Sequence, residues 1–177
     1  LYVYGFQAEL GSYATSYIPT DGSTVTRSAD VANNSGNADL FNDSEGVLYA
    51  EISALADDIT KRKIAIGNSS NRIILGYKNY TNQVRAEIIS SSSSVFDNTQ
   101  SIDNITTFSK FAIKYKQNDF AFWINGFEVA TDTSGNTPIG LSELAFDDGG
   151  SNNFYGKVKT VAVFKEALTD EELAKIT

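Results

Sequence analysis

Acidic, basic and aromatic side chains of the kinds that bind sugars occur in several segments of this sequence. The candidate residues are Tyr49, Glu51, Arg85, Glu87, Trp123 and Glu128. A sugar presents apolar C–H faces together with many hydroxyl groups, so an aromatic platform beside planar polar groups suits it. If these residues point outward from neighbouring strands, they form one glycan site. In the alternative interpretation, Trp123 packs against a loop and the charges pair across strands on a solvated face.

Two oxygen-rich segments offer the ligands that Ca²⁺ prefers. One contains Asp147 and Asp148, followed by two glycines, and the other contains Asp30 with Asn33 and Asn34. The sequence Asp-Asp-Gly-Gly is also an ordinary turn sequence, and the turn is the favoured interpretation. No cofactor is therefore certain, and Ca²⁺ is the candidate.

The composition excludes several kinds of chemistry and of partner. The 177 residues include no Cys and no His, so there is no disulfide framework, no thiolate and no His-based acid–base or metal site. The net charge of −8 argues against a duplex nucleic-acid partner and against an anionic membrane. No apolar run approaches the ~18 residues of a membrane span, so membrane insertion is not expected.

Residues 120–131 predict a β-hairpin that carries Trp123 and Glu128 side by side on one face. Asn125 and Gly126 supply two residues that tolerate a positive φ, as a type I′ turn requires. A two-residue loop fixes the register of the two strands. The predicted cross-strand pairs are Ile124–Phe127 and Phe122–Val129, and the predicted core face holds Phe120, Phe122, Ile124, Phe127 and Val129.

Short segments with strand patterns, separated by turns, extend over most of the chain. Strands are predicted at 47–54, 62–67, 72–77, 83–90, 108–116, 141–146 and 154–164, with one or two more in residues 1–18. Residues 28–46 are predicted to form a long loop, and the serine run at 90–94 a polar loop or edge. The pattern predicts an all-β chain, folded as an antiparallel β-sandwich or jelly roll.

One short α-helix is predicted at the C-terminus, in residues 168–176. Thr169 followed by Glu172 is a capping box, and Leu168 with Leu173 forms a hydrophobic staple. We expect this helix to be structural and to lay Leu173 and Ile176 over one end of the sandwich.

Two segments resemble a known family. The strand and hairpin at 111–126 end in Ile-Asn-Gly, and residues 156–173 run from Gly-Lys-Val to Leu-Thr-Asp-Glu-Glu-Leu. Together they resemble the laminin-G-like branch of the concanavalin A-like lectin/glucanase superfamily, over residues 46–176. The resemblance implies a concanavalin A-like jelly roll. Glucanases of that superfamily carry a Glu-x-Asp-x-x-Glu strand, which this sequence lacks, so it is not expected to be an enzyme.

The N-terminal segment resembles a second kind of sequence. Residues 4–20, which begin Tyr-Gly-Phe-Gln and end Tyr-Ile-Pro-Thr, and residues 25–31 resemble a junction in bacteriophage tail and other virion proteins. The resemblance implies that residues 1–20 are the last strand and junction of an upstream domain, and that residues 21–177 form the lectin domain. Because the chain starts at Leu1 rather than Met, we expect a fragment or processed product of a longer polypeptide.

These patterns and resemblances predict a non-catalytic carbohydrate-binding or adhesion module of a phage or virion surface protein. Its expected partner is a glycan or polysaccharide of a host surface, and its expected location is the virion. The alternative hypothesis is a purely structural or decorating domain that contacts other virion subunits or another copy of itself. A polysaccharide-degrading enzyme is the third hypothesis.

Overall fold

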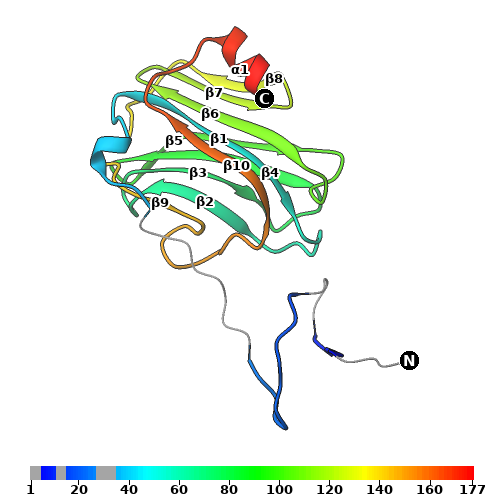
Figure 1. The fold of residues 1–177 in the computed structure, drawn as a ribbon. Helices are drawn as coiled ribbons and strands as arrows, with labels where there is room; N and C mark the ends of the chain where they lie inside the picture. Colours follow the sequence, from blue (N-terminus) through cyan, green and yellow to red (C-terminus); the bar gives the residue numbers. More distant parts are fainter. Residues whose placement is uncertain (1–4, 11–14, 27–34) are drawn as a thin grey trace.

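Two antiparallel sheets stacked face to face form the body of the protein (Figure 1). The computed structural model describes residues 5–10, 15–26 and 35–177. Within these residues, sheet A has the strand order β5-β4-β3-β2-β9 and sheet B has the order β10-β1-β6-β7-β8. The prediction of an antiparallel β-sandwich with a short C-terminal helix is confirmed.

Each sheet combines strands from several parts of the chain. Sheet A consists of β2 (Arg62–Gly67), β3 (Arg72–Tyr77), β4 (Gln83–Ser90), β5 (Ser93–Ser101) and β9 (Leu144–Ala145). Sheet B consists of β1 (Glu45–Ala54), β6 (Ser109–Lys116), β7 (Asp119–Ile124), β8 (Phe127–Asp132) and β10 (Gly156–Phe164). Outside the sheets are the 3₁₀ helix η1 (Ala38–Leu40) and the α-helix α1 (Asp170–Ile176). Neither of these described helices has the length and apolar character needed to cross a membrane.

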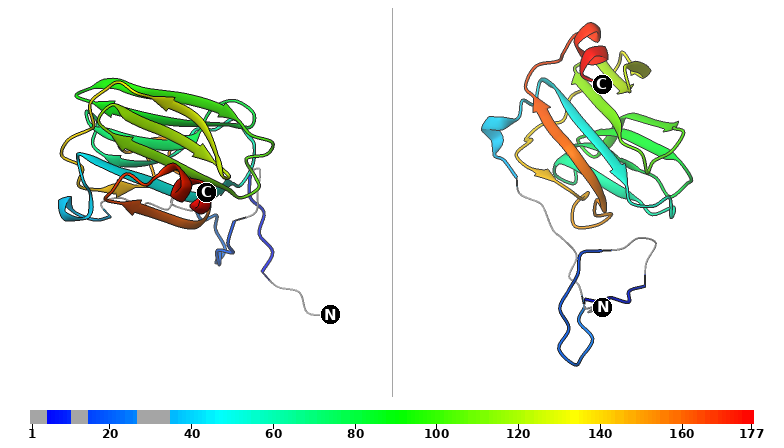
Figure 2. Two further views of the ribbon diagram at one scale, coloured as in Figure 1. Left: turned by 90° about the horizontal axis from the view of Figure 1, so that it is seen from above. Right: turned by 45° about the vertical axis from the view of Figure 1, so that its right-hand side comes forward.

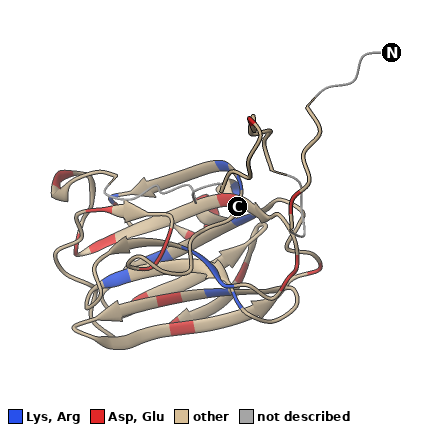
Figure 3. Ribbon diagram, turned by 90° about the horizontal axis from the view of Figure 1, so that it is seen from below, with Lys and Arg blue, Asp and Glu red and all other residues tan. Residues whose placement is uncertain are grey.

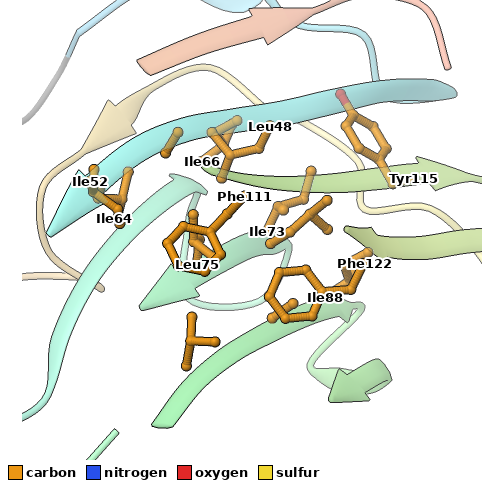
Figure 4. Close-up of a cluster of buried hydrophobic side chains, with 14 of the residues drawn as sticks. Leu48, Ile52, Ile64, Ile66, Ile73, Leu75, Ile88, Phe111, Tyr115 and Phe122 are labelled. Carbon is orange, nitrogen blue, oxygen red and sulfur yellow. The ribbon is translucent and has the colours of Figure 1, made fainter. Parts of the chain in front are cut away.

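The core lies between the inner faces of the two sheets, where alternate side chains of each strand meet. Leu48 from β1 and Ile73 and Leu75 from β3 are fully buried there. Figure 4 shows them gathered with the rings of Phe111 and Phe122, whose centroids lie 6.3 Å apart in a stacked arrangement. Burying a side chain of this size stabilises the fold by roughly 1.5–3 kcal/mol, so this apolar layer holds the sheets together.

The strand bounds agree closely with the prediction in sheet A. The segments 62–67, 72–77 and 83–90 are strands with the predicted bounds, whereas the strand predicted at 141–146 is reduced to Leu144–Ala145. The prediction did not include β5, because Val95 and Phe96 are its only large apolar residues and no alternation is visible. Ser91 and Ser92, with φ of 50° and 65°, make the turn that leads into it.

The Asn-Gly hairpin between β7 and β8 is confirmed, with Asn125 and Gly126 at φ of 47° and 89°. A register shift after the first pairs places Phe122 opposite Ala130, so the predicted pairing of Phe122 with Val129 is wrong. Phe127 is 74% exposed, and its predicted place in the core is also wrong. In the described part of the chain β8 is the edge strand of sheet B, so no further strand covers this ring.

Residues 5–10 and 15–26 form an extended segment that lies outside the sandwich (Figure 2). These described residues contain no strand, and the rest of the prediction for residues 1–18 falls outside the described ranges. Gln7 Oε1 accepts a hydrogen bond from the Ile18 N–H at 2.8 Å. Residues 1–4, 11–14 and 27–34 lie outside the described residues. The described part of the predicted loop contains η1 and the buried Phe41.

The C-terminal helix α1 has the predicted capping box between Thr169 and Glu172. Contrary to prediction, it covers the outer face of sheet B rather than one end of the sandwich. Leu173 is fully buried in a second apolar cluster with Tyr49 and Trp123, and Ile176 packs against the edge of this cluster. The outer face of sheet B is therefore a helix-packing surface.

Leu173→Ala tests this docking. Deleting a fully buried leucine side chain is expected to lower the free energy of unfolding by roughly 2–5 kcal/mol. Trp123 is the single tryptophan of the chain, so its fluorescence should shift to longer wavelength as the helix loosens. Lys175→Ala, on the exposed side of the same helix, is the control and should change neither quantity appreciably. Equal effects of the two substitutions would contradict the docking.

Candidate functional site

The six residues predicted to bind sugar lie on two opposite outer faces of the molecule. Tyr49 and Glu51 on β1, Trp123 on β7 and Glu128 on β8 belong to sheet B, whereas Arg85 and Glu87 on β4 belong to sheet A. Outward residues of the two sheets of a sandwich point away from each other. The prediction that all six share neighbouring strands in one site is therefore wrong.

The four residues on sheet B share its outer face, and Trp123 lies directly opposite Glu128 as predicted, but most of their side chains are occupied in structural contacts. Trp123 is 6% exposed and Tyr49 is 8% exposed, both beneath α1. Glu51 forms an ion pair with Lys159 of β10 at 2.7 Å. Burial, followed by the charge of Asp170, raises the pKa of Glu128. The alternative interpretation is thus correct for the Trp123 ring, with a helix rather than a loop as its cover.

The outer face of sheet A contains a hollow over the C-terminal half of β3, which we call the Gly76 cavity. Cross-strand register places Lys63, Gly76, Arg85 and Thr99 in one row on neighbouring strands. Gly76 forms the floor of this hollow between Lys63 and Arg85. The cavity has a volume of about 300 Å³, at the lower end of the range of ligand pockets. Its lining consists of Lys61, Lys63, Ile74, Gly76, Tyr77, Lys78, Asn79, Tyr80 and Arg85.

The close approach of the neighbouring strand β2 excludes a side chain at position 76. A Cβ there would collide with the carbonyl oxygen of Arg62 and would lie 2.9 Å from the Cγ of Lys63. Strand β2 therefore lies closer to the backbone of residue 76 than any residue except glycine would allow. The cavity floor is a consequence of sheet packing.

Arg85 forms one wall of the cavity and is held by two carboxylates. Its Nε donates to Asp97 at 2.7 Å and its Nη2 donates to the other Asp97 oxygen at 2.6 Å. Glu87, two residues along β4, accepts a further hydrogen bond from Nη2 at 3.0 Å. The hydrogen bond from Arg85 lowers the pKa of Asp97. This is the cross-strand pairing that the alternative interpretation predicted for these charges.

Lys63 forms the opposite wall and is held by Asp148. Their ion pair joins β2 to the turn after β9. Burial alone raises the pKa of Asp148, but hydrogen bonds from Lys63, Asn152 and Ser151 outweigh that effect, and its pKa is lowered. Asp147 accepts a hydrogen bond from the Gly149 N–H at 2.9 Å. Figure 3 shows such basic and acidic segments interspersed over the strands.

These contacts support the turn interpretation of Asp147 and Asp148 rather than a calcium site. Residues 5–10, 15–26 and 35–177 contain no group of three acidic, Cys or His side chains that could hold a metal ion. Ca²⁺ prefers six to eight oxygen ligands, and the Asp148 carboxylate already serves Lys63 and Asn152. The residues present do not fit the ion. The second candidate, Asp30 with Asn33 and Asn34, lies outside the described residues.

The loop before β2 presents Lys61 at the rim of the cavity. Arg62 is 1% exposed and its guanidinium donates to both Asp58 oxygens, at 2.7 and 2.8 Å. Ile59, between the paired residues, has a φ of 54°, which is strained for a β-branched side chain. This partly buried ion pair holds the strained turn in place and so positions Lys61.

The opposite rim carries a lysine and an exposed ring. Lys78 Nζ lies 5.6 Å from the centroid of the Tyr80 ring and 3.4 Å from the Thr99 Oγ1. Tyr80 is 56% exposed. Among the described residues, neither Lys61 nor Lys78 forms an ion pair. These two ammonium groups remain available to a ligand.

A second hollow adjoins the first. It has a volume of about 430 Å³ and is lined by Thr60, Lys61, Asn79, Asn152, Asn153 and Tyr155. Lys61 and Asn79 line both hollows. We call this the Tyr155 hollow. Together the two form a continuous surface of amide, ammonium and phenol groups.

A larger hollow of about 790 Å³ is lined wholly by residues 6–26 of the N-terminal segment. Its apolar residues Phe6 and Leu10 are fully or largely exposed, and no strand supports its walls. A binding site requires groups held in fixed positions by the scaffold. The two hollows over sheet A meet that requirement better.

The sequence prediction missed the lysine and tyrosine residues of the rim. It contained Arg85, but residues 78–82, between the strands predicted at 72–77 and 83–90, were not considered as part of a site. A signal was present, because Lys61 and Lys63 alternate with Arg62 and so share one face of a strand. Which face stays open depends on sheet stacking.

Three carboxylates near this face are expected to make the free energy of unfolding depend on pH. The pKa values of Asp58, Asp97 and Asp148 are all lowered from 3.8 in the folded state. Groups with lowered folded pKa values stabilise the fold above their unfolded pKa, and this contribution is lost as the pH falls through the folded pKa. The raised pKa of Glu128 acts in the opposite sense near its unfolded value. Urea unfolding should show a free energy that declines below about pH 4, where the three aspartates outweigh Glu128. A free energy that keeps rising below about pH 4 would contradict the lowered pKa values of these three carboxylates.

Several solved structures share the fold. The carbohydrate-binding module CBM40 of the Ruminococcus gnavus IT-sialidase, bound to α2,3-sialyllactose, has a TM-score of 0.63 at 15% identity, covering 84% of this chain and 95% of that chain. Domain 4 of AbnA, an extracellular arabinanase of Geobacillus stearothermophilus in complex with arabinotriose, has a TM-score of 0.62 at 13% identity, covering 77% and 68%. The NanB sialidase of Streptococcus pneumoniae has a TM-score of 0.62 at 14% identity, covering 77% and 24%.

The sequence itself matches one family model. No curated protein matches the chain significantly. The family model described as the concanavalin A-like lectin/glucanases superfamily matches residues 31–174, which is most of the chain and all of the sandwich. The stacked five-stranded antiparallel sheets agree with that match. The chain therefore belongs to the concanavalin A-like lectin/glucanases superfamily.

Proposed function

We propose that this protein is a non-catalytic carbohydrate-binding module that holds a glycan on the outer face of sheet A. The observation that carries the proposal is the Gly76 cavity, in which a sheet-supported hollow is edged by an exposed aromatic ring and by two lysines that form no ion pair among the described residues. The structures with sialyllactose and arabinotriose support it, because those domains share this fold and bind glycans.

The rim residues supply the two kinds of contact that a sugar needs. The Tyr80 ring offers an apolar surface for the C–H face of a sugar, and its hydroxyl adds a polar contact. The Asn79 amide carries both a donor and an acceptor for hydroxyl groups, and Lys61 and Lys78 add charged donors. Sites for small ligands combine such groups in one concave place.

The adjoining Tyr155 hollow extends the proposal to more than one sugar unit. Because Lys61 and Asn79 line both hollows, a glycan seated in the Gly76 cavity continues past them toward Tyr155. Asn152 and Asn153 supply amide groups there. We therefore expect oligosaccharides to bind more tightly than single sugars.

The carboxylates beside the cavity suit binding rather than hydrolysis. A glycosidase needs a carboxylic acid with a raised pKa as its proton donor. Here Asp97 and Asp148 both have lowered pKa values because Arg85 and Lys63 hold them as anions. The raised pKa belongs to Glu128, on the opposite sheet. The absence of activity remains part of the proposal, and reducing-sugar release from polysaccharides would contradict it.

The virion context remains a proposal that rests on the sequence of the N-terminal segment. We propose that residues 1–20 join this domain to an upstream domain of a phage or virion surface protein, and that the glycan belongs to a host surface. Purified particles that contain the full-length product would support this location. A product found only in the cytosol would contradict it.

A structural role in contacts between protein subunits is the competing proposal. The observation that favours it is the edge strand β8, whose Phe127 ring is largely exposed. Exposed strand edges pair readily with other chains unless they are protected. Assembly that depends on Phe127, in the absence of any bound glycan, would support this role over glycan recognition.

Tyr80→Ala tests the proposed site. Removing the ring should weaken glycan binding by about tenfold, since an aromatic contact contributes roughly 0.5–1.5 kcal/mol beyond its buried area. The melting temperature should hardly change because the ring is exposed. Phe127→Ala is the matched control, as it removes an exposed ring from the opposite sheet. Titration calorimetry with glycans selected from a glycan array measures the affinity of both variants. Equal loss of affinity in the two variants would place the site elsewhere.

A further inference from the structure

The Gly76 cavity is basic although the chain as a whole is acidic. The net charge is −8, with 22 acidic and 14 basic residues. The lining of the cavity nevertheless includes Lys61, Lys63, Lys78 and Arg85 and no acidic residue. Nearby carboxylates hold Lys63 and Arg85, so Lys61 and Lys78 are the cations whose charge no ion pair among the described residues compensates.

Lys61 and Lys78 flank the last cross-strand pair of β2 and β3, which joins Arg62 to Tyr77. They are the next residues outward from that pair, just beyond the ends of the two strands. Both line the Gly76 cavity. Like charges held close together repel each other.

We propose that the anionic group of an acidic sugar binds between Lys61 and Lys78 in the Gly76 cavity. The inference rests on the proposed glycan site and names the class of sugar that the site takes. A carboxylate or sulfate there accepts charge-assisted hydrogen bonds from both ammonium groups and relieves their repulsion. Tyr80, beside Lys78, then lies where it can contact the ring of the same sugar.

The overall charge restricts the ligand further. A chain with a net charge of −8 repels a long polyanion, whereas the two lysines attract one local negative charge. The cavity of about 300 Å³ has room for one ring-sized group. The ligand is therefore an acidic sugar within an otherwise uncharged glycan rather than a densely charged polysaccharide.

Matched pairs of ligands test the proposal directly. Titration calorimetry compares sialyllactose with lactose, sulfated lactose with lactose, and oligogalacturonate with its carboxyl-reduced form. The first and second pairs separate recognition of a carboxylate from recognition of a sulfate. The third pair tests a glycan that carries a negative charge on every sugar unit. At least one singly charged member should bind about tenfold or more tighter than its neutral counterpart, and raising the salt concentration should reduce that preference.

Charge-removing variants locate the preference. Lys61→Gln and Lys78→Gln should each reduce the preference for the acidic sugar by about tenfold, as expected for the loss of one charge-assisted hydrogen bond. Lys175→Gln, an exposed lysine on α1, is the control and should retain the full preference. Without ligand, the two cavity variants should melt no lower than the parent, since each removes one of two like charges that line the same cavity.

The outcomes separate this inference from the function on which it rests. Equal affinity for acidic and neutral partners, or a preference that survives both lysine substitutions, overturns the acidic-sugar assignment while the glycan site stands. Binding of only the oligogalacturonate overturns it too. Failure of every acidic and neutral member to bind overturns the proposed function itself. A lower melting temperature in Lys61→Gln and Lys78→Gln would mean that the lysines have a structural role.

Discussion

The apolar contact between the inner faces of the two sheets is the interaction on which the other features depend. It buries the aliphatic and aromatic side chains of nearly every strand in one layer. Because side chains alternate along a strand, committing one set to this layer commits the other set to the outer faces. The row of Lys63, Gly76 and Arg85 lies on the open side for this reason alone.

The two outer faces then have different roles because their residues differ. The outward positions of sheet B include Val47, Tyr49 and Trp123, which are apolar enough to require a cover, and α1 provides it through Leu173. The outward positions of sheet A are mostly charged or small, and nothing in the described chain packs over the Gly76 cavity. A helix on one side and an open polar face on the other make the sandwich asymmetric.

Ion pairs organise the open face more than they stabilise it. Partly exposed pairs contribute little to stability, but those of Arg85 with Asp97 and of Lys63 with Asp148 fix the walls of the cavity. They also hold the carboxylates as anions, away from the protonation state that acid catalysis requires. The partly buried pair between Arg62 and Asp58 maintains the strained turn at Ile59. In this way the pairs leave Lys61 and Lys78 as the available cations.

The sequence by itself determined the antiparallel sandwich, most of its strands, the Asn-Gly hairpin and the capped helix, because these depend on local patterns of alternation, turn residues and capping. Only the tertiary structure decided which candidate residues are exposed and which of them share a face. Whether Trp123 is exposed depends on where Leu173 docks, much later in the chain, and whether Arg85 and Trp123 share a face depends on which strands join which sheet. Both depend on contacts between distant segments, and these leave no mark in the spacing of neighbouring residues.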